Sequence, residues 1–318
     1  MDLIKKIKNI LTNNNFYFLK ISYLAGDASS RHYFTIDCNN SVYVLMYDKD
    51  KKSLENFVSV SKILNNYVTV PKIIEVFPSE DVLIMENFGE KKYSQILNTK
   101  NRKELYSVAV DALIQIHTHN FYNCVPNYTS KIFLKESILF FEWYVNKSSY
   151  NNINELKKKF SDLFISLFNK IKTLPTVFIH RDYHIDNLFF LEDRKDFFRC
   201  GWIDFQDALH GFCVYDILSL TQDARIDFPT ELESEMINNY LKKFSHIYRD
   251  EFLFAYDLIA IQRHLKILGI FSRLNKRDKK KLYLRHIPRV EKLLIKNLNK
   301  APFSNLKYLI YPLLNYEN

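Results

Sequence analysis

The sequence predicts an α+β protein in which a small antiparallel β-sheet lobe precedes a larger α-helical lobe. Three observations lead to this fold class. Five short apolar segments with the pattern of strands lie before residue 87, with one helical segment inserted among them. After Lys92, apolar residues recur at helical spacing over most of the chain. This second part also contains a strand, a polar loop and a hairpin between residues 178 and 207. We therefore expect two domains, residues 1–87 and residues 88–318.

The first part combines a terminal helix with a sheet. Apolar residues from Leu3 to Leu11 recur at helical spacing and predict an amphipathic helix. Residues 23–36 have the pattern of a strand, a polar loop and a second strand. The rest of this lobe is expected to consist of strands over residues 41–47, 70–76 and 82–86, a helix over residues 54–64 and a linker over residues 87–90.

The second part has the apolar spacing of helices on both sides of the polar loop. Helices are expected over residues 104–119, 131–145, 153–171, 214–223, 231–248 and 251–274, followed by a helical tail. Only a short turn is expected between residue 204 and the helix that begins near Val214.

The polar loop and the hairpin carry residue types that suit phosphoryl transfer. Residues 180–187 fit the pattern His-Arg-Asp-x-x-x-x-Asn, and Asp204 opens a second polar stretch. Phosphoryl transfer needs a carboxylate that accepts the proton of the attacking hydroxyl, and hard oxygen ligands that hold Mg²⁺ against the phosphates. Asp182 fits the first role, and Asn187 and Asp204 fit the second. A hairpin over residues 188–203 would return Asp204 beside Asn187.

Two other interpretations of this stretch remain open. The polar residues could simply cap a surface turn between strands. Alternatively His180, Asp182, His184 and Asp186 alternate, so that on a strand they would share one face and could ligate a transition metal. The second interpretation leaves Asn187 and the Asp204 strand without a role.

Composition narrows the class of protein but does not decide the function. The chain has 318 residues, of which 47% are hydrophobic and 25% are charged, as in globular proteins. Its net charge of +9 suits anionic ligands such as nucleotides, and also nucleic acid. The basic run at residues 276–281 has no accompanying nucleic-acid motif, so we expect a solvated turn there and no nucleic-acid partner.

Location is predicted from the cysteines and from the absence of targeting patterns. The four cysteines form no CxxC pair and are expected to be reduced thiols. The charged N-terminus lacks a signal-peptide core, and no apolar run is long enough to span a bilayer. We therefore expect a cytoplasmic protein without a membrane partner. The oligomeric state is not predicted.

Six segments together resemble a known family. They are LAGDASSRHYF (residues 24–34), LIMENFGE (83–90), FFEWYV (140–145), HRDYHIDNLFF (180–190), IDFQDALHGFCVYDILSLTQDAR (203–225) and QRHLKILGIFSRL (262–274). They resemble the two-lobed protein-kinase-like fold in its aminoglycoside and choline phosphotransferase branch. More narrowly, they resemble the bacterial anomeric sugar kinases that phosphorylate N-acetylmuramate and N-acetylglucosamine at the 1-hydroxyl in cell-wall recycling.

The resemblance implies an ATP- and Mg²⁺-dependent small-molecule kinase. It makes Asp182 the catalytic base, and Asn187 and Asp204 the Mg²⁺ ligands. The nucleotide-binding residues that it implies are Ser29, Ser30 and Arg31 over the phosphates, and Glu86 and Phe88 in a hinge whose backbone meets adenine.

The resemblance also implies residues for the sugar side and for support of the loop. Arg263 is a candidate for substrate binding, although it could equally pair with a carboxylate. His180 and Asp216 are expected to support the catalytic loop structurally. The remaining candidates for the sugar side are Glu142, Trp143 and Tyr144, whose aromatic rings could instead belong to the core.

One departure from the kinase pattern concerns the third strand, where a Lys normally contacts the α- and β-phosphates. Met46 occupies that place, so Arg31 or Lys49 would have to replace the Lys, and Glu55 lacks its usual partner. Two alternatives therefore stay open. One is an aminoglycoside, choline or homoserine phosphotransferase on the same fold, and the other is a nucleotide-binding pseudokinase scaffold.

Overall fold

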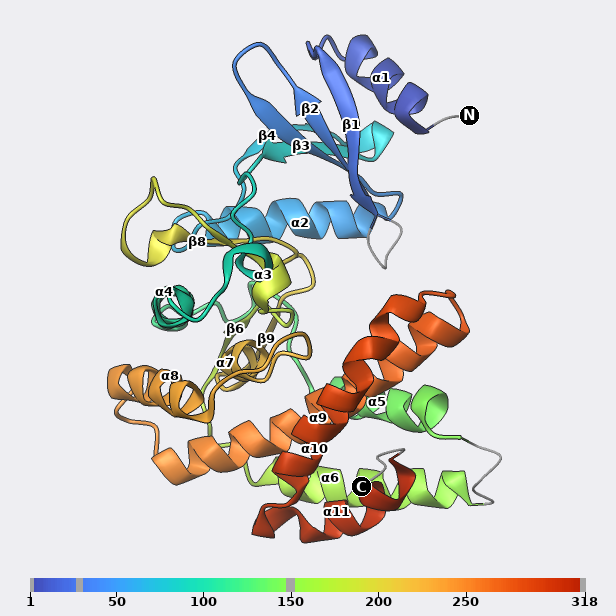
Figure 1. Cartoon of the computed structure of the whole chain (residues 1–318), viewed down its shortest axis with the longest axis vertical. Helices are drawn as coiled ribbons and strands as arrows, with labels where there is room; N and C mark the ends of the chain where they lie inside the picture. Colours follow the sequence, from blue (N-terminus) through green and yellow to red (C-terminus); the bar gives the residue numbers. More distant parts are fainter. Residues whose placement is uncertain (1–2, 27–30, 147–151, 315–318) are drawn as a thin grey trace. The chain divides into compact units, whose positions relative to one another are not determined.

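The computed structural model describes residues 3–26, 31–146 and 152–314. It divides into two compact units, each made of two stretches of chain (Figure 1). The first, here called the sheet unit, comprises Met1–Thr118 and His180–Ala208. The second, the helical unit, comprises His119–Ile179 and Leu209–Asn318. The lobe boundary predicted after residue 87 does not coincide with this division. Because compactness does not test where a functional lobe begins, that boundary stays a prediction.

The sheet unit contains a five-stranded antiparallel sheet in the order β1-β2-β3-β5-β4. Strands β2 and β3 pair in continuous register, for example Phe34 with Leu45. The predicted strands are therefore confirmed, with ends that differ by a few residues. The strands are β1 (Lys20–Gly26), β2 (His32–Asp37), β3 (Val42–Tyr47), β4 (Ile73–Phe77) and β5 (Val82–Glu86).

Two helices accompany this sheet. Helix α1 (Leu3–Asn13) lies along the sheet and buries Ile7, Ile10 and Leu11 in a common core with the strands (Figure 1). Helix α2 (Lys51–Leu64) begins after Asp50, whose carboxylate accepts hydrogen bonds from two backbone N–H groups of the first turn. Residues 51–53 carry no apolar signal, which is why the apolar pattern alone placed the start of α2 three residues too late.

The rest of the sheet unit surrounds the polar loop. It contains η1 (Pro78–Glu80), α3 (Tyr93–Ile96), α4 (Arg102–His117), η4 (Ile185–Asn187), β7 (Leu188–Phe190), η5 (Asp196–Arg199) and β8 (Cys200–Trp202). Strands β7 and β8 pair antiparallel, so the predicted hairpin is confirmed. Between its two strands the hairpin contains the 3₁₀ turn η5, which begins at Asp196, whose φ is 50°. The Tyr183 hydroxyl donates to the Ala109 carbonyl at 2.8 Å and so ties the loop to α4.

The helical unit is built around its longest helix. Helix α9 is buried along most of its length and contacts α5, α10 and η2. The helical elements are α5 (Ser130–Leu139), η2 (Phe140–Tyr144), α6 (Ile153–Asn169), α7 (Tyr215–Thr221), α8 (Thr230–Lys243), α9 (Arg249–Lys276), η6 (Lys281–His286), α10 (Ile287–Leu298), η7 (Ala301–Phe303), α11 (Ser304–Ile310) and η8 (Tyr311–Leu313).

Two features of the helical unit differ from the prediction. The helix expected over residues 131–145 changes to a π-helical turn, η2, after Leu139. At this place α9 approaches so closely that a Cβ on Gly269 would lie 2.4 Å from the Leu139 carbonyl carbon. In addition, β6 (Thr176–Ile179) pairs antiparallel with β9 (Leu209–Phe212), where only a short turn was expected before α7.

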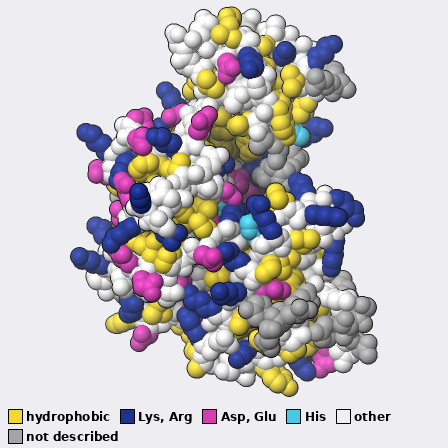
Figure 2. Space-filling view, in the orientation of Figure 1, with side chains coloured by type: hydrophobic (Ala, Val, Ile, Leu, Met, Phe, Trp, Pro, Cys, Tyr) yellow, Lys and Arg dark blue, Asp and Glu magenta, His cyan; other side chains and the backbone are white. Residues whose placement is uncertain are grey.

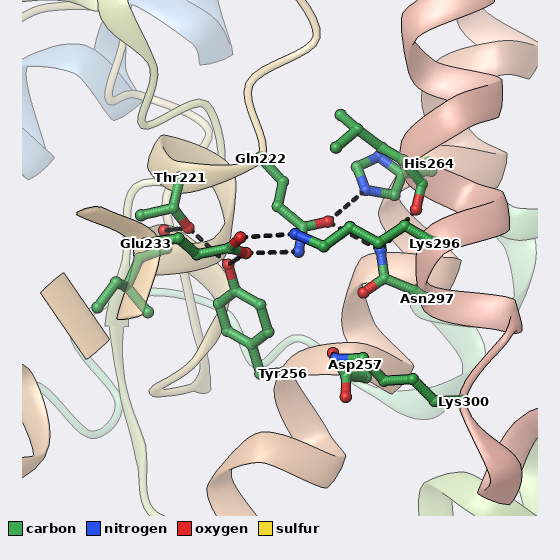
Figure 3. A network of polar contacts seen from close by, with 11 residues as sticks. Thr221, Gln222, Glu233, Tyr256, Asp257, His264, Lys296, Asn297 and Lys300 are labelled. Carbon is green, nitrogen blue, oxygen red and sulfur yellow. Dashed lines mark hydrogen bonds and ion pairs between the residues drawn. The ribbon is translucent and has the colours of Figure 1, made fainter. Parts of the chain in front are cut away.

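A buried polar network joins α8, α9, α10 and the end of α7 (Figure 3). The Glu233 carboxylate accepts hydrogen bonds from Tyr256 and Lys296 at 2.7 Å each, and from the Gln222 amide at 2.9 Å. The Gln222 carbonyl oxygen accepts two further hydrogen bonds of 2.9 Å, from His264 and Asn297. Both polar side-chain atoms of Glu233 and of Gln222 are thus hydrogen-bonded, which offsets the cost of burying these two residues.

Exposed basic side chains belong to both units. Figure 2 shows Lys and Arg side chains spread over the visible face of both units. Within the parts of the chain that the structure describes, no helix combines the length and the apolar character needed to cross a membrane.

Candidate active site

The polar loop is held at its start by a buried histidine. The His180 Nε2 atom lies 3.0 Å from the Ile203 carbonyl oxygen, which can only accept, so Nε2 carries the proton. Burial lowers the pKa of His180 to about 4, so the ring is neutral at pH 7. The next residue, Arg181, has a φ of 74°, a conformation that costs energy for a side chain larger than glycine. Such local strain is common where a loop is shaped for function.

The loop then folds around the backbone of Asp182. The Asp182 carbonyl accepts hydrogen bonds from the His184 N–H at 3.1 Å and from the Asn187 amide nitrogen Nδ2 at 3.0 Å. Since Nδ2 donates to this carbonyl, Oδ1 is the atom of Asn187 that can ligate a cation. One side-chain amide thereby couples the two predicted functional positions, 182 and 187.

The β7–β8 hairpin returns the chain to this loop. Leu188 pairs with Trp202, and the Ile203 N–H donates to the Asn187 carbonyl at 3.0 Å. Asp204 therefore follows directly beside Asn187, and both residues line one cavity. Asp204 has a φ of 63°, again a left-handed conformation on a non-glycine residue.

The Asp204 carboxylate is the centre of a charged cluster that the sequence did not reveal. Its Oδ1 accepts from Arg31 Nη1 at 2.7 Å and from Gln206 Nε2 at 2.9 Å. The Arg31 guanidinium also approaches Asp48 Oδ2 at 3.9 Å from Nε and Asp207 Oδ2 at 3.8 Å from Nη2. Asp48, Gln206 and Asp207 are thus site residues missed by sequence reasoning, since no spacing relates residues 31, 48 and 204.

A cavity of about 1020 Å³ lies within the sheet unit. Its apolar wall includes Val44, Met85, Phe189 and Ile203, while Asp186, Asn187 and Asp204 supply oxygen atoms. This lining fits a ligand that has an apolar part and a part that carries a cation.

The predicted hinge borders this cavity. Phe88 lines it, and its ring lies 5.7 Å from that of Phe189. The Glu86 carboxylate is turned to other partners, the Lys72 N–H at 3.1 Å and Arg194 Nη2 at 2.7 Å. Glu86 thus shapes the hinge through its side chain, and its backbone N–H is also engaged, because it donates to the Lys72 carbonyl at 2.8 Å.

The other residues predicted near the phosphates differ in whether and where the structure places them. Ser29 and Ser30 lie outside the described residues, so the structure does not place them. Met46 is 1% exposed, whereas Lys49 and Glu55 are exposed on the surface. Of the two candidates to replace the third-strand Lys, Arg31 is therefore the one beside Asp204, and Glu55 is a solvated helix residue.

The oxygen donors fit a hard divalent cation. Asn187 Oδ1 and the Asp204 carboxylate are amide and carboxylate oxygens, the ligand types that Mg²⁺ prefers. The transition-metal alternative is not supported, because residues 180–184 form a loop and not a strand. Among residues 3–26, 31–146 and 152–314, no three His, Cys, Asp or Glu side chains are placed to hold a metal.

The candidates for the sugar side all belong to the helical unit. Glu142 is exposed, 3.9 Å from Lys157 Nζ, and Trp143 is half-buried in η2. Tyr144 is buried and donates its hydroxyl to Glu291. Arg263, the remaining candidate for substrate binding, is buried and donates to the Ser219 hydroxyl. Asp216, which was predicted to support the catalytic loop, lies in the first turn of α7 and has no exposed surface.

Two curated kinases are similar to this chain in sequence. An N-acetylmuramate/N-acetylglucosamine kinase of Pseudomonas aeruginosa is 31% identical over 274 residues, which cover 83% of this chain and 80% of that protein. A kinase of the same name from Neisseria meningitidis serogroup B is 28% identical over 282 residues, covering 85% of this chain and 83% of the relative.

Solved structures show the same fold. The ADP-bound aminoglycoside phosphotransferase APH(2'')-Ib superposes with a TM-score of 0.64 at 18% identity, over 92% of this chain and 97% of that one. A choline kinase from Streptococcus pneumoniae gives 0.67 at 13% identity, over 93% and 100%. These likenesses confirm the predicted α+β, kinase-like fold class. The model of the phosphotransferase enzyme family matches residues 20–253. The resemblance found in the sequence is thus confirmed, and the chain belongs to the phosphotransferase enzyme family.

Proposed function

We propose that this chain is an ATP- and Mg²⁺-dependent kinase that phosphorylates the anomeric 1-hydroxyl of N-acetylmuramate or N-acetylglucosamine. The observation that carries the proposal is that Asn187 and Asp204 line one cavity, directly after the loop that bears Asp182. The sugar class is supported by the names of relatives that match 83% and 85% of the chain.

In this reaction the 1-hydroxyl oxygen bonds to the γ-phosphorus, and the bond between that phosphorus and the ADP oxygen breaks. Asp182 accepts the proton of the hydroxyl as it attacks. Asn187 Oδ1 and the Asp204 carboxylate would hold Mg²⁺, which when bound would neutralise charge on the phosphates. Arg31 supplies a further positive charge beside Asp204, and we also assign Ser29 and Ser30 to the phosphates.

The remaining assignments are part of the same proposal. The backbone from Glu86 to Phe88 meets the adenine ring. Trp143 and Glu142 have enough exposed surface to contact a ligand, whereas Tyr144 and Arg263 are buried and would act by shaping that side. The product would feed cell-wall recycling. A cytoplasmic location is supported by the four cysteines, which are free thiols.

The test is transfer of labelled phosphate from ATP and Mg²⁺ to N-acetylmuramate, N-acetylglucosamine, kanamycin, choline and homoserine. We expect transfer to the amino sugars, and none to their methyl glycosides, because methylation removes the attacking proton. Asp182→Asn is the matched control, since it keeps the size of the side chain but cannot accept a proton.

The other outcomes separate the alternatives. Transfer only to kanamycin, choline or homoserine would overturn the sugar assignment and keep the kinase chemistry. ATP binding without transfer to any acceptor in the panel, and with no loss of ATP on incubation, would favour the scaffold alternative.

A further inference from the structure

The Arg31 side chain occupies a buried position among carboxylates. Its side chain is 9% exposed, and the three acidic groups around it come from three segments: Asp48 after β3, Asp204 after β8, and Asp207 three residues later. A buried guanidinium is tolerated only where it is paired. One positive and three negative formal charges leave this cluster at −2, so it would attract a divalent cation.

A cation that binds Asp204 would compete with the hydrogen-bond donors that already contact its carboxylate. Oδ1 already accepts from Arg31 at 2.7 Å and from Gln206 at 2.9 Å. A carboxylate oxygen has two lone pairs, so both lone pairs of Oδ1 are engaged, and a metal can ligate Oδ1 only by displacing a donor. The guanidinium charge also lies within a few ångströms of any ion bound to this carboxylate, where like charges repel strongly.

We propose that Arg31 serves as an internal counter-cation for Asp204, which keeps the metal site weak until a nucleotide arrives. The proposal rests on the assignment of Asp204 as a metal ligand made above. Phosphate oxygens offer the guanidinium a partner at least as good as a carboxylate. When they draw Arg31 away, Oδ1 becomes accessible, so the metal and the nucleotide enter together. Asp48, which is almost fully buried, stays as a fixed partner of the Arg31 Nε in both states.

A counter-cation and a purely structural partner predict opposite changes in metal affinity when Arg31 is removed. A side chain that only stabilises Asp204 would, when removed, leave the metal site disordered and weaker. A counter-cation would, when removed, leave it stronger in the absence of nucleotide. The same change would weaken triphosphate binding, because the phosphates lose their guanidinium partner. Two opposite shifts from one substitution are therefore expected.

The experiment measures Mn²⁺ binding to the full chain without nucleotide, by electron paramagnetic resonance of the free ion. We expect Arg31→Gln to bind Mn²⁺ about tenfold or more tightly than the unchanged protein, since removing a nearby like charge removes its repulsion. In metal-free buffer the same variant should lose about tenfold in its preference for ATP over AMP, which is the loss expected for one charge-assisted contact. Arg31→Met, which keeps an unbranched apolar side chain and removes the charge, replaces Arg31→Gln if that variant does not fold.

Two further variants make the result interpretable. Arg199→Gln removes the same charge from the sheet unit, where Arg199 pairs with Glu104 at 2.7 Å, and should change neither affinity. Adding Asp204→Asn to Arg31→Gln should abolish the gain in Mn²⁺ affinity. Unchanged or weaker Mn²⁺ binding in the Arg31 variants would overturn the counter-cation role. Tighter binding that persists in the double variant would instead overturn the assignment of Asp204 as the ligand, and with it the counter-cation role.

Discussion

Arg194 lies in the turn between β7 and β8 and joins this turn to the hinge. Its Nη2 donates to Glu86 Oε1 at 2.7 Å, its Nη1 donates to Thr69 Oγ1 at 3.2 Å, and its guanidinium carbon lies 5.7 Å from the centre of the Phe88 ring. Arg194→Ala removes all three contacts. Because Phe88 lines the cavity, we expect the hinge to become less ordered and nucleotide affinity to fall.

The size of the effect follows from the exposure of these groups. The Arg194 and Glu86 side chains are 29% and 33% exposed, so solvent screens their ion pair and it contributes about 0.5–1 kcal/mol. The hydrogen bond to Thr69 adds about 1 kcal/mol. The cation–π contact with Phe88 adds about 0.5 kcal/mol. If most of the combined energy goes into ordering the hinge before binding, the ATP dissociation constant rises about tenfold.

The assay is steady-state transfer at varied ATP concentration, together with direct titration of ATP. Arg194→Ala should raise KM for ATP and the dissociation constant about tenfold and leave kcat within about twofold, because the lost contacts act equally on ground state and transition state. Arg199→Ala is the matched control: it loses an ion pair to Glu104 and a cation–π contact with Phe190 in the same unit, but no contact with the hinge. Equal changes in ATP affinity for both variants, or none for Arg194→Ala, would refute this reasoning.

Three further predictions concern catalysis, pH and packing. Asp182→Asn should lower kcat by about 10²–10⁴ while ATP still binds, as measured by transfer and by titration; an unchanged kcat would exclude Asp182 as the base. Burial lowers the pKa of His180 to about 4 and that of His264 to about 3, so both take up protons more readily when unfolded. Their contribution to stability is complete above pH 6.5 and falls with pH below it, by about 1.4 kcal/mol per pH unit for each group down to its folded pKa. Urea unfolding at pH 7 and pH 5 measures this, and equal stability at the two pH values would contradict it. Gly269→Ala should lower the free energy of unfolding by about 1–3 kcal/mol, because the new methyl group meets the backbone at the end of α5; an unfolding midpoint equal to that of the unchanged protein would show that α5 and α9 can separate without cost.

The parts of the site that could be predicted are those close in sequence. The spacing of Asp182 and Asn187 places both in one loop, and a run of apolar, charged and apolar residues reveals the hairpin that returns Asp204. These inferences need only local geometry, so the proximity of Asn187 and Asp204 followed from the sequence.

The contacts that could not be predicted join distant segments. Arg31 meets Asp204 across more than 170 positions, and no local pattern specifies which carboxylate a buried guanidinium will choose. The π-helical turn after Leu139 also depends on tertiary packing, because α9 lies close to the Leu139 backbone at Gly269. Strand β9 is too short for a periodic signal, and its existence depends on its partner β6.

The sheet unit is assembled from two separate stretches of chain, and this constrains how it can be made. Residues 180–208 leave and re-enter the helical unit at neighbouring points, since Ile179 and Leu209 pair in the β6–β9 ladder. A fragment that ends at Thr118 therefore contains the sheet but neither Asn187 nor Asp204. During synthesis the cavity cannot be completed until Asp204 has left the ribosome, by which time residues 119–179 of the helical unit have already emerged. Conversely, a two-residue turn that joins Ile179 to Leu209 would close a β-hairpin and turn the helical unit into one continuous polypeptide.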